Sequence, residues 1–180
     1  MTEPHTVSSG LSALAIRSRS VVDPQILQHF LDTFLYRQEA VFLDEITTVD
    51  TESKRIEAVF ETTRPLPFAK QQRTSPNHPA HVSGPEIILA TASLGCLHAY
   101  LFYGCRWDEG WAGFGNRVHR ADFKQLASIG PPIELVCCET RGRIGPARIV
   151  LRFDFEFRQQ GKLVYRGDQT AMFVKEKKLG

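Results

Sequence analysis

The chain lacks a cysteine pattern that would build a disulfide framework or a zinc site. Its four cysteines are Cys96, Cys105, Cys137 and Cys138, of which the last two are adjacent. Disulfide-rich secreted domains and structural zinc sites both need characteristic cysteine spacings. The absence of these spacings predicts a reducing compartment. At 180 residues, the chain is long enough to bury a core without such crosslinks.

Charge of one sign is not concentrated anywhere in the sequence. The chain has 22 Lys and Arg against 20 Asp and Glu, so its formal net charge is +2. A dedicated nucleic-acid surface usually shows as a basic run or stripe, and we therefore expect no nucleic-acid partner. A modest basic rim for an acidic carrier or a phosphorylated cofactor is compatible with this composition.

The first 22 residues have neither a long apolar core nor a signal-cleavage pattern. We expect residues 1–22 to be disordered or loosely packed and the protein to be cytoplasmic. No internal repeat is evident, so residues 23–180 are predicted to form a single domain.

Apolar periodicity and turn residues predict the order of the helices and strands. In chain order they are a helix from Asp23-Pro24 to about Leu35, a hairpin of strands 40–49 and 54–62, a proline-rich connection 63–82, a helix ending near Gly104, and strands 114–126, 133–140, 147–158 and 162–174. The clearest strand is 147–158, where five apolar residues alternate with mostly charged ones.

The helix that ends near Gly104 has no formally charged residue after Glu86. A helix that is apolar all round must be covered on every side. It is short, and rich in small and polar residues, for a membrane span, so we expect no membrane insertion. With strands on both sides of it in the sequence, an α+β layer architecture follows.

Two sets of motifs resemble known families. The segment His81-Val82-Ser83-Gly84-Pro85-Glu86-Ile87-Ile88-Leu89 resembles the helix start of the FcoT-like acyl-CoA thioesterases. The segments 37–44 and 161–165 resemble, more distantly, the FabA/FabZ 3-hydroxyacyl-acyl-carrier-protein dehydratases. Both families have the hotdog fold, an antiparallel β-sheet wrapped around a long central helix.

This resemblance implies a homodimer or higher homo-oligomer with substrate sites between subunits. It also implies an acyl thioester substrate, on coenzyme A or on an acyl carrier protein, and no cofactor or metal. The catalytic set departs from both families. Leu89 stands where the dehydratase carboxylate would align, Thr91 is nearest to the helical carboxylate of common hotdog thioesterases, and Ala92 replaces an expected Asn.

His81 and Glu86 are the candidate catalytic residues. His81 lies just before a helix N-terminus, where backbone N–H groups and the helix dipole favour negative charge, and histidine titrates near neutral pH. The alternative is a loop histidine that only packs. Ser83-Gly84-Pro85-Glu86 fits the S-x-x-E capping box, which explains Glu86 structurally; as a functional residue, Glu86 would orient His81 or activate water.

Five further residues are candidates for the oxyanion hole or for substrate binding: Ser83, Gly84, Thr91, Asn116 and His119. Close packing explains Thr91 equally well, and a solvated strand face explains Asn116 and His119. The leading functional prediction is thioester hydrolysis. The alternatives are dehydration of a 3-hydroxyacyl thioester, or acyl binding without catalysis.

Overall fold

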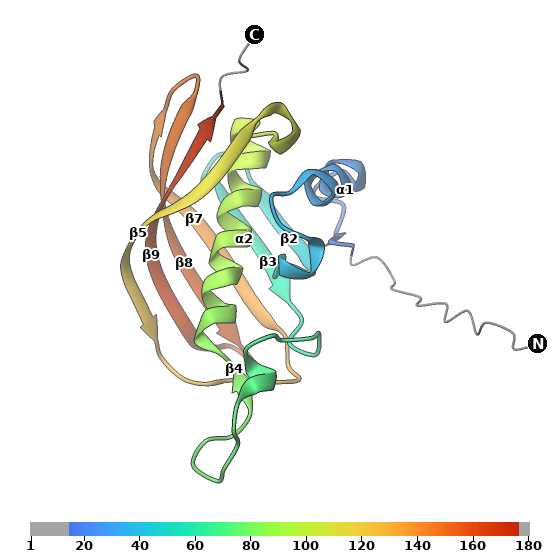
Figure 1. Cartoon of the computed structure of the whole chain (residues 1–180), viewed down its shortest axis with the longest axis vertical. Coiled ribbons are helices and arrows are strands. Elements are labelled where there is room, and N and C mark those ends of the chain that lie inside the picture. Colours follow the sequence, from blue (N-terminus) through green and yellow to red (C-terminus); the bar gives the residue numbers. More distant parts are fainter. Residues whose placement is uncertain (1–14, 177–180) are drawn as a thin grey trace, which may run out of the picture.

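The computed structural model describes residues 15–176, in which a long helix lies against one face of a curved sheet (Figure 1). The elements are, in chain order, β1 (Arg17–Ser18), α1 (Pro24–Thr33), η1 (Gln38–Ala40), β2 (Glu45–Asp50), β3 (Arg55–Phe60), η2 (Ala69–Gln71), β4 (His81–Val82), α2 (Gly84–Tyr103), η3 (Trp107–Glu109), β5 (Trp111–Phe123), β6 (Ala127–Ser128), β7 (Ile133–Ile144), β8 (Arg148–Gln159) and β9 (Lys162–Lys175). The elements labelled η are single 3₁₀ turns.

Seven strands form the main sheet in the order β1-β2-β3-β7-β8-β9-β5. Neighbouring strands are antiparallel, except that β1 runs parallel to β2. Because β3 pairs with β7 while β5 lies at the far edge, the connection through α2 carries the chain across the sheet (Figure 1). β4 and β6 form a separate two-stranded ladder beside the start of α2.

The core lies between α2 and the inner face of the sheet. The predicted alternation of β8 is confirmed, because its inner residues are at most 2% exposed: Ile149, Leu151, Phe153, Phe155 and Phe157. Burying each such side chain contributes about 2 kcal/mol. Gly95 of α2 packs against this row, and a Cβ atom placed there would be in ordinary van der Waals contact with the Phe153 ring, at 3.5 Å.

The predicted start and end of α2 are also confirmed. At the start of the helix, Glu86 Oε2 accepts the backbone N–H of Ser83 at 2.8 Å, which is the Glu86 half of the capping box; the Ser83 hydroxyl has no hydrogen-bond partner among the described residues. It ends at Gly104, whose φ of 63° is readily adopted by glycine and whose N–H bonds to the carbonyl of Ala99. By length and composition alone α2 is apolar enough to cross a membrane, but 61% of its most apolar stretch is buried in the fold, as in a core helix.

The prediction of a strand from residue 40 is wrong, because β2 begins only at Glu45. Val41, Phe42 and Leu43 are all at most 3% exposed, so this segment buries consecutive residues instead of alternating ones. It crosses α2, where the Phe42 N–H donates to Ser93 Oγ at 3.1 Å. Other boundaries differ by a few residues, as α1 ends at Thr33 and β7 continues to Ile144.

The segment that was expected to be disordered or loosely packed falls partly within the described residues. Residues 17–18 form β1 and pair with β2, and Ile16 and Val22 are at most 9% exposed. Residues 1–14 and 177–180 lie outside the described part of the chain.

Candidate functional site

Glu86, on the first turn of α2, is fully buried. Its Oε1 accepts the backbone N–H groups of Phe68 and Ala69, both at 2.9 Å, and its Oε2 accepts that of Ser83 at 2.8 Å. The carboxylate therefore caps α2 and anchors η2 of the preceding connection. This geometry favours the capping interpretation of Glu86 over the catalytic one.

His81 lies on β4, in front of the first turn of α2. Its Nδ1 is 2.8 Å from the carbonyl of Pro79. A carbonyl only accepts, so Nδ1 carries the proton in the neutral ring and Nε2 is the basic nitrogen. Gln72 fixes the backbone here, because its amide accepts from the His81 N–H at 3.1 Å and donates to the His81 carbonyl at 3.0 Å.

A pocket of about 350 Å³ opens beside this histidine at the N-terminus of α2. Its lining includes His81, Gly84, Phe123 and Leu126. A Cβ atom on Gly84 would lie 3.4 Å from the Phe123 ring, an ordinary van der Waals distance, so the helix start packs directly against the end of β5. Of the predicted residues, this pocket brings together His81 and Gly84, with Ser83 between them in the chain.

A second, mostly apolar cavity of about 190 Å³ lies between the middle of α2 and the sheet. Its lining includes Leu89, Ala92, Gly115, Phe153 and Phe155. None of the residues lining it is Asp, Glu, Lys, Arg or His. An uncharged group is therefore the occupant that this cavity suits.

One polar contact reaches the wall of the apolar cavity. Thr91 Oγ1 donates to the carbonyl of Ile88 at 2.7 Å and lies 3.1 Å from Gln169 Oε1. Gln169 Nε2 then donates to the hydroxyl of Tyr165 at 3.0 Å. The Tyr165 ring is 5.2 Å from that of Phe123, so these contacts connect the cavity wall with the pocket at the helix start.

Sequence reasoning missed Gln169 and Tyr165. Both lie on the inner side of β9, since Gln169 pairs with Phe153 and Tyr165 with Phe157. The available signal was a glutamine at an inward position of an alternating strand.

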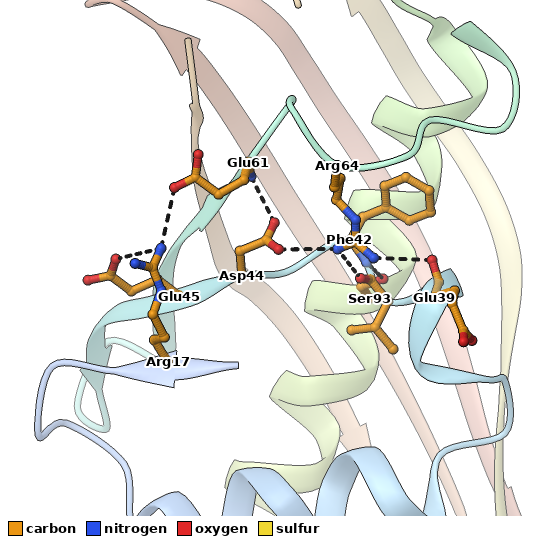
Figure 2. Close-up of polar contacts among 9 residues, drawn as sticks. Arg17, Glu39, Phe42, Asp44, Glu45, Glu61, Arg64 and Ser93 are labelled. Atoms are coloured by element: carbon orange, nitrogen blue, oxygen red, sulfur yellow. Dashed lines mark hydrogen bonds and ion pairs between the residues drawn. The ribbon is translucent and has the colours of Figure 1, made fainter. Parts of the chain in front are cut away.

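A buried arginine holds the crossing segment that forms another part of the cavity wall, at Ala40. The side chain of Arg64 is only 6% exposed; its guanidinium donates to the carbonyls of Val41 and Glu39 and lies 3.4 Å from Asp44 Oδ1 (Figure 2). Asp44 in turn accepts the backbone N–H of Glu61. Arg64 thus holds this segment against the chain that follows β3, and the Phe42–Ser93 hydrogen bond joins the segment to α2.

Asn116 and His119 lie elsewhere. Both fall at register shifts in the pairing of β5 with β9, and both line a groove on the outer face of the sheet. His119 Nε2 is 2.8 Å from Thr170 Oγ1. The structure therefore distributes the predicted residues over three places: the helix start, the apolar cavity (Thr91) and the outer groove. The substrate contacts of Asn116 and His119 stay predictions.

Within residues 15–176, no group of three or more His, Cys, Asp or Glu side chains is arranged to hold a metal ion. The four cysteines are free thiols.

No protein-family model matches the chain, and no curated protein sequence is similar enough to match it. Solved structures do match. A mutant thioesterase from Pseudomonas aeruginosa aligns with a TM-score of 0.57 at 15% identity, over 88% of this chain and 98% of its own. A thioesterase from Haemophilus influenzae aligns with a TM-score of 0.55 at 13% identity, over 86% of this chain and 94% of its own. A chain of the dehydratase heterocomplex ApeI:P from Xenorhabdus doucetiae aligns with a TM-score of 0.57 at 11% identity, over 82% of this chain and 91% of its own.

The chain has the α+β hotdog fold, as the sequence predicted: a mostly antiparallel seven-stranded sheet around one long helix. Thioesterases and a dehydratase share this fold. At sequence identities of 11–15%, structural similarity shows a shared fold but not a shared reaction.

Proposed function

We propose that the protein is an acyl-thioester hydrolase. The acyl group would lie in the apolar cavity beside α2, and the thioester carbonyl would lie in the pocket at the N-terminus of α2. The observation that carries this proposal is the cavity itself, which is lined without Asp, Glu, Lys, Arg or His in a fold that known thioesterases share. Buried apolar cavities with a few placed polar groups are typical small-molecule sites.

The helix start supplies the elements of a hydrolytic centre. Backbone N–H groups and the dipole of α2 at Gly84 would stabilise the oxyanion that forms when water adds to the carbonyl carbon. His81 Nε2 would accept the proton of that water and return it to the departing thiolate. Thr91 and Gln169 would position the acyl group at the cavity wall.

Dehydration is the less supported alternative. That reaction needs a base for the C2 proton and an acid for the departing hydroxyl. Glu86, the nearest carboxyl group to His81 in the sequence motif, is fully buried and committed to three backbone N–H groups. Acyl binding without catalysis is favoured by one observation, the lack of Asp, Glu, Lys, Arg or His in the cavity lining.

We also propose that the protein is a homodimer. β5 lies at one edge of the main sheet, and in the described part of the chain only β9 pairs with it. Along this strand Val118 and Phe123 are 55% and 54% exposed. The unpaired N–H and C=O groups of an exposed edge strand can pair with a strand of another chain. Analytical ultracentrifugation tests this proposal, and a strictly monomeric protein at micromolar concentration would contradict it.

The decisive experiment offers the purified protein saturated and 3-hydroxyacyl thioesters on both carriers and identifies the products by mass spectrometry. We expect free acid and free thiol from the saturated substrates. His81→Gln should lower kcat by about 100-fold or more, the usual contribution of a general base. His78→Gln is the matched control, because His78 is an exposed neighbour with a ring centroid 5.1 Å away.

Each other outcome overturns the proposal in a different way. A 2-enoyl thioester without thiol release would make the protein a dehydratase. Tight binding without turnover would make it an acyl-binding protein. Full activity of the His81→Gln variant would move the catalytic centre away from the start of α2.

A further inference from the structure

Two histidines, His78 and His81, lie side by side in the loop that leads into α2. The segment between η2 and β4 projects away from the sheet as a loop, and His81 is the first residue of β4 (Figure 1). The two ring centroids are 5.1 Å apart. The hydrolysis proposed above uses His81 alone, so it gives no reason for a second imidazole at this distance.

Hydrogen bonds to the backbone fix the same tautomer in both rings. His78 Nδ1 is 3.1 Å from the carbonyl oxygen of Arg73, and His81 Nδ1 is 2.8 Å from that of Pro79. A carbonyl only accepts, so each neutral ring carries its proton on Nδ1 and its lone pair on Nε2. Within residues 15–176, neither Nε2 forms a hydrogen bond or an ion pair. A backbone carbonyl bound to the other ring nitrogen is the usual setting of a metal-binding histidine.

The backbone that carries the two rings is also held in place. Ser75 and His78 exchange two backbone hydrogen bonds of 3.0 Å. The side-chain amide of Gln72 binds both the N–H and the carbonyl of His81, at 3.1 and 3.0 Å. Pro79 lies between the histidines and restricts the backbone further. Two ligands that are held in this way lose little conformational freedom when they bind.

The separation of the rings fits one shared metal ion. A tetrahedral Zn²⁺ lies about 2 Å from each imidazole nitrogen, which places the centroids of two bound rings about 5 Å apart. The observed separation is 5.1 Å, and the ring planes are inclined by 76°. The rings therefore do not stack face to face, an arrangement in which their lone pairs would be parallel and could not meet at one ion. Edge-to-face packing of two rings gives a similar separation, and a metal titration distinguishes the two explanations.

We propose that His78 and His81 together bind a Zn²⁺ ion through their Nε2 atoms. Neutral imidazole is a preferred ligand of zinc. The residues that line the pocket beside His81 include no Asp, Glu or Cys, so water molecules complete the coordination. Such a site has only two protein ligands, which agrees with the lack of any group of three or more within residues 15–176. It differs from closed structural zinc sites, which have four protein ligands.

The bound ion would regulate the centre at the start of α2. This consequence rests on the proposed hydrolase function, in which His81 Nε2 accepts the proton of the attacking water. A zinc ion on Nε2 occupies the lone pair that this step needs. Zinc therefore inhibits hydrolysis, and a chelator that removes the ion restores it. His78 acts in this inhibition only, as the second ligand of the ion.

Isothermal titration of Zn²⁺ into the chelator-treated full-length protein tests the site without depending on turnover. We expect one ion per chain and no binding of Mg²⁺, which prefers oxygen ligands. His78→Gln and His81→Gln should each weaken zinc binding by about 100-fold or more, because even the loss of a partner behind a ligand weakens binding by about 10–100-fold. His119→Gln, in the outer groove, is the matched control and should bind zinc as the unmodified protein does.

A second readout identifies the ligands directly. In long-range ¹H–¹⁵N spectra of the histidine rings, the Nε2 resonances of His78 and His81 should shift together as zinc is added. Equal zinc affinity in the protein and in both variants would overturn the proposal, because the ion would then be held elsewhere, for example by the half-buried thiols of Cys96 or Cys138. No zinc binding at all would overturn it as well, and would leave the ring pair as edge-to-face packing.

Turnover assays separate the site from the proposed function. Zinc that saturates the site should inhibit thioester hydrolysis by the unmodified protein, and the same zinc concentration should leave the rate of His78→Gln unchanged. Equal inhibition of His78→Gln would overturn the regulatory role of the pair. If zinc binds both rings but hydrolysis continues, the site stands and His81 is not the general base. If zinc binds and no thioester is hydrolysed under any condition, the site stands and the proposed hydrolase activity fails.

Discussion

At the N-terminal end of α2, the buried carboxylate of Glu86 accepts three backbone N–H groups, whereas toward the C-terminal end the buried ring of His98 has far fewer partners. His98 Nε2 lies 3.1 Å from the carbonyl of Lys54, and Nδ1 has no hydrogen-bond partner among the described residues. A charge surrounded by aligned peptide dipoles is tolerated inside the fold. The imidazole, without such partners, is buried as the neutral form.

Burial lowers the pKa of His98 to about 4. The Glu139 carboxylate is 3.5 Å from Nε2 and would favour a charged ring, but it already accepts the hydroxyl proton of Tyr103 at 2.8–2.9 Å. Desolvation therefore outweighs this neighbour. His98 therefore has a structural role, whereas His81 lines a pocket and its chemical role stays a proposal.

The largest expected effect is at Glu86. Glu86→Ala leaves three buried N–H groups without an acceptor and should lower the free energy of unfolding by about 3–5 kcal/mol, measured by urea denaturation. Glu86→Gln keeps one acceptor oxygen and should lower it by about 1–2 kcal/mol.

Glu52→Ala, in the exposed turn between β2 and β3, is the control and should change stability by less than about 0.5 kcal/mol. A Glu86→Gln variant of normal stability that had lost all turnover would restore the catalytic interpretation of this residue.

The next effect is the pH dependence of stability at His98. The pKa in the folded state is about 4, below the ordinary value of 6.5, so the unfolded chain takes up the proton first as the pH falls. Stability is then fully present above pH 6.5 and declines between pH 6.5 and 4, by up to about 3 kcal/mol. Urea titrations across this range should show the slope.

His98→Gln removes this titration and should flatten the slope, while His78→Gln, at an exposed position, should leave it as it is. Equal slopes in the protein and in the His98→Gln variant would mean that another group titrates.

The smallest effect is at Tyr103. Tyr103→Phe removes the hydroxyl that donates to the Glu139 carboxylate and should lower the free energy of unfolding by about 1 kcal/mol at neutral pH. The freed carboxylate should then raise the pKa of His98, shifting the loss of stability to a higher pH. Tyr36→Phe, at a position 66% exposed, is the control. A variant with the same pH midpoint would show that Glu139 has no influence on His98.

Local patterns predicted those parts of the molecule in which neighbours in sequence are also neighbours in space. The alternation of β8, the hairpin of β2 and β3, and the cap of α2 all belong to this kind. The apolar cavity and its polar wall could not be predicted in the same way. Thr91 and Gln169 are 78 residues apart and meet only because β9 takes one register against β8.

Arg141 and Arg152, which line the outer groove, were missed for the same reason. The sequence shows them on separate strands, and only the register shift after Glu139 sets them opposite each other. The resemblance at the start of α2 indicated the fold correctly. The S-x-x-E pattern alone left Glu86 with two readings, and its burial and three backbone partners favour the capping one.

The crossing of the sheet by α2 has a consequence for the nascent chain. β3 is made early, yet its partner β7 is synthesised only after α2 and β5. Until β7, β8 and β9 are complete, the apolar sides of α2 and of the first hairpin have no sheet to cover them. Such non-local pairing slows folding and leaves aggregation-prone intermediates with exposed apolar surface. We therefore expect this protein to depend on chaperones while it is being made, even though its finished core is well packed.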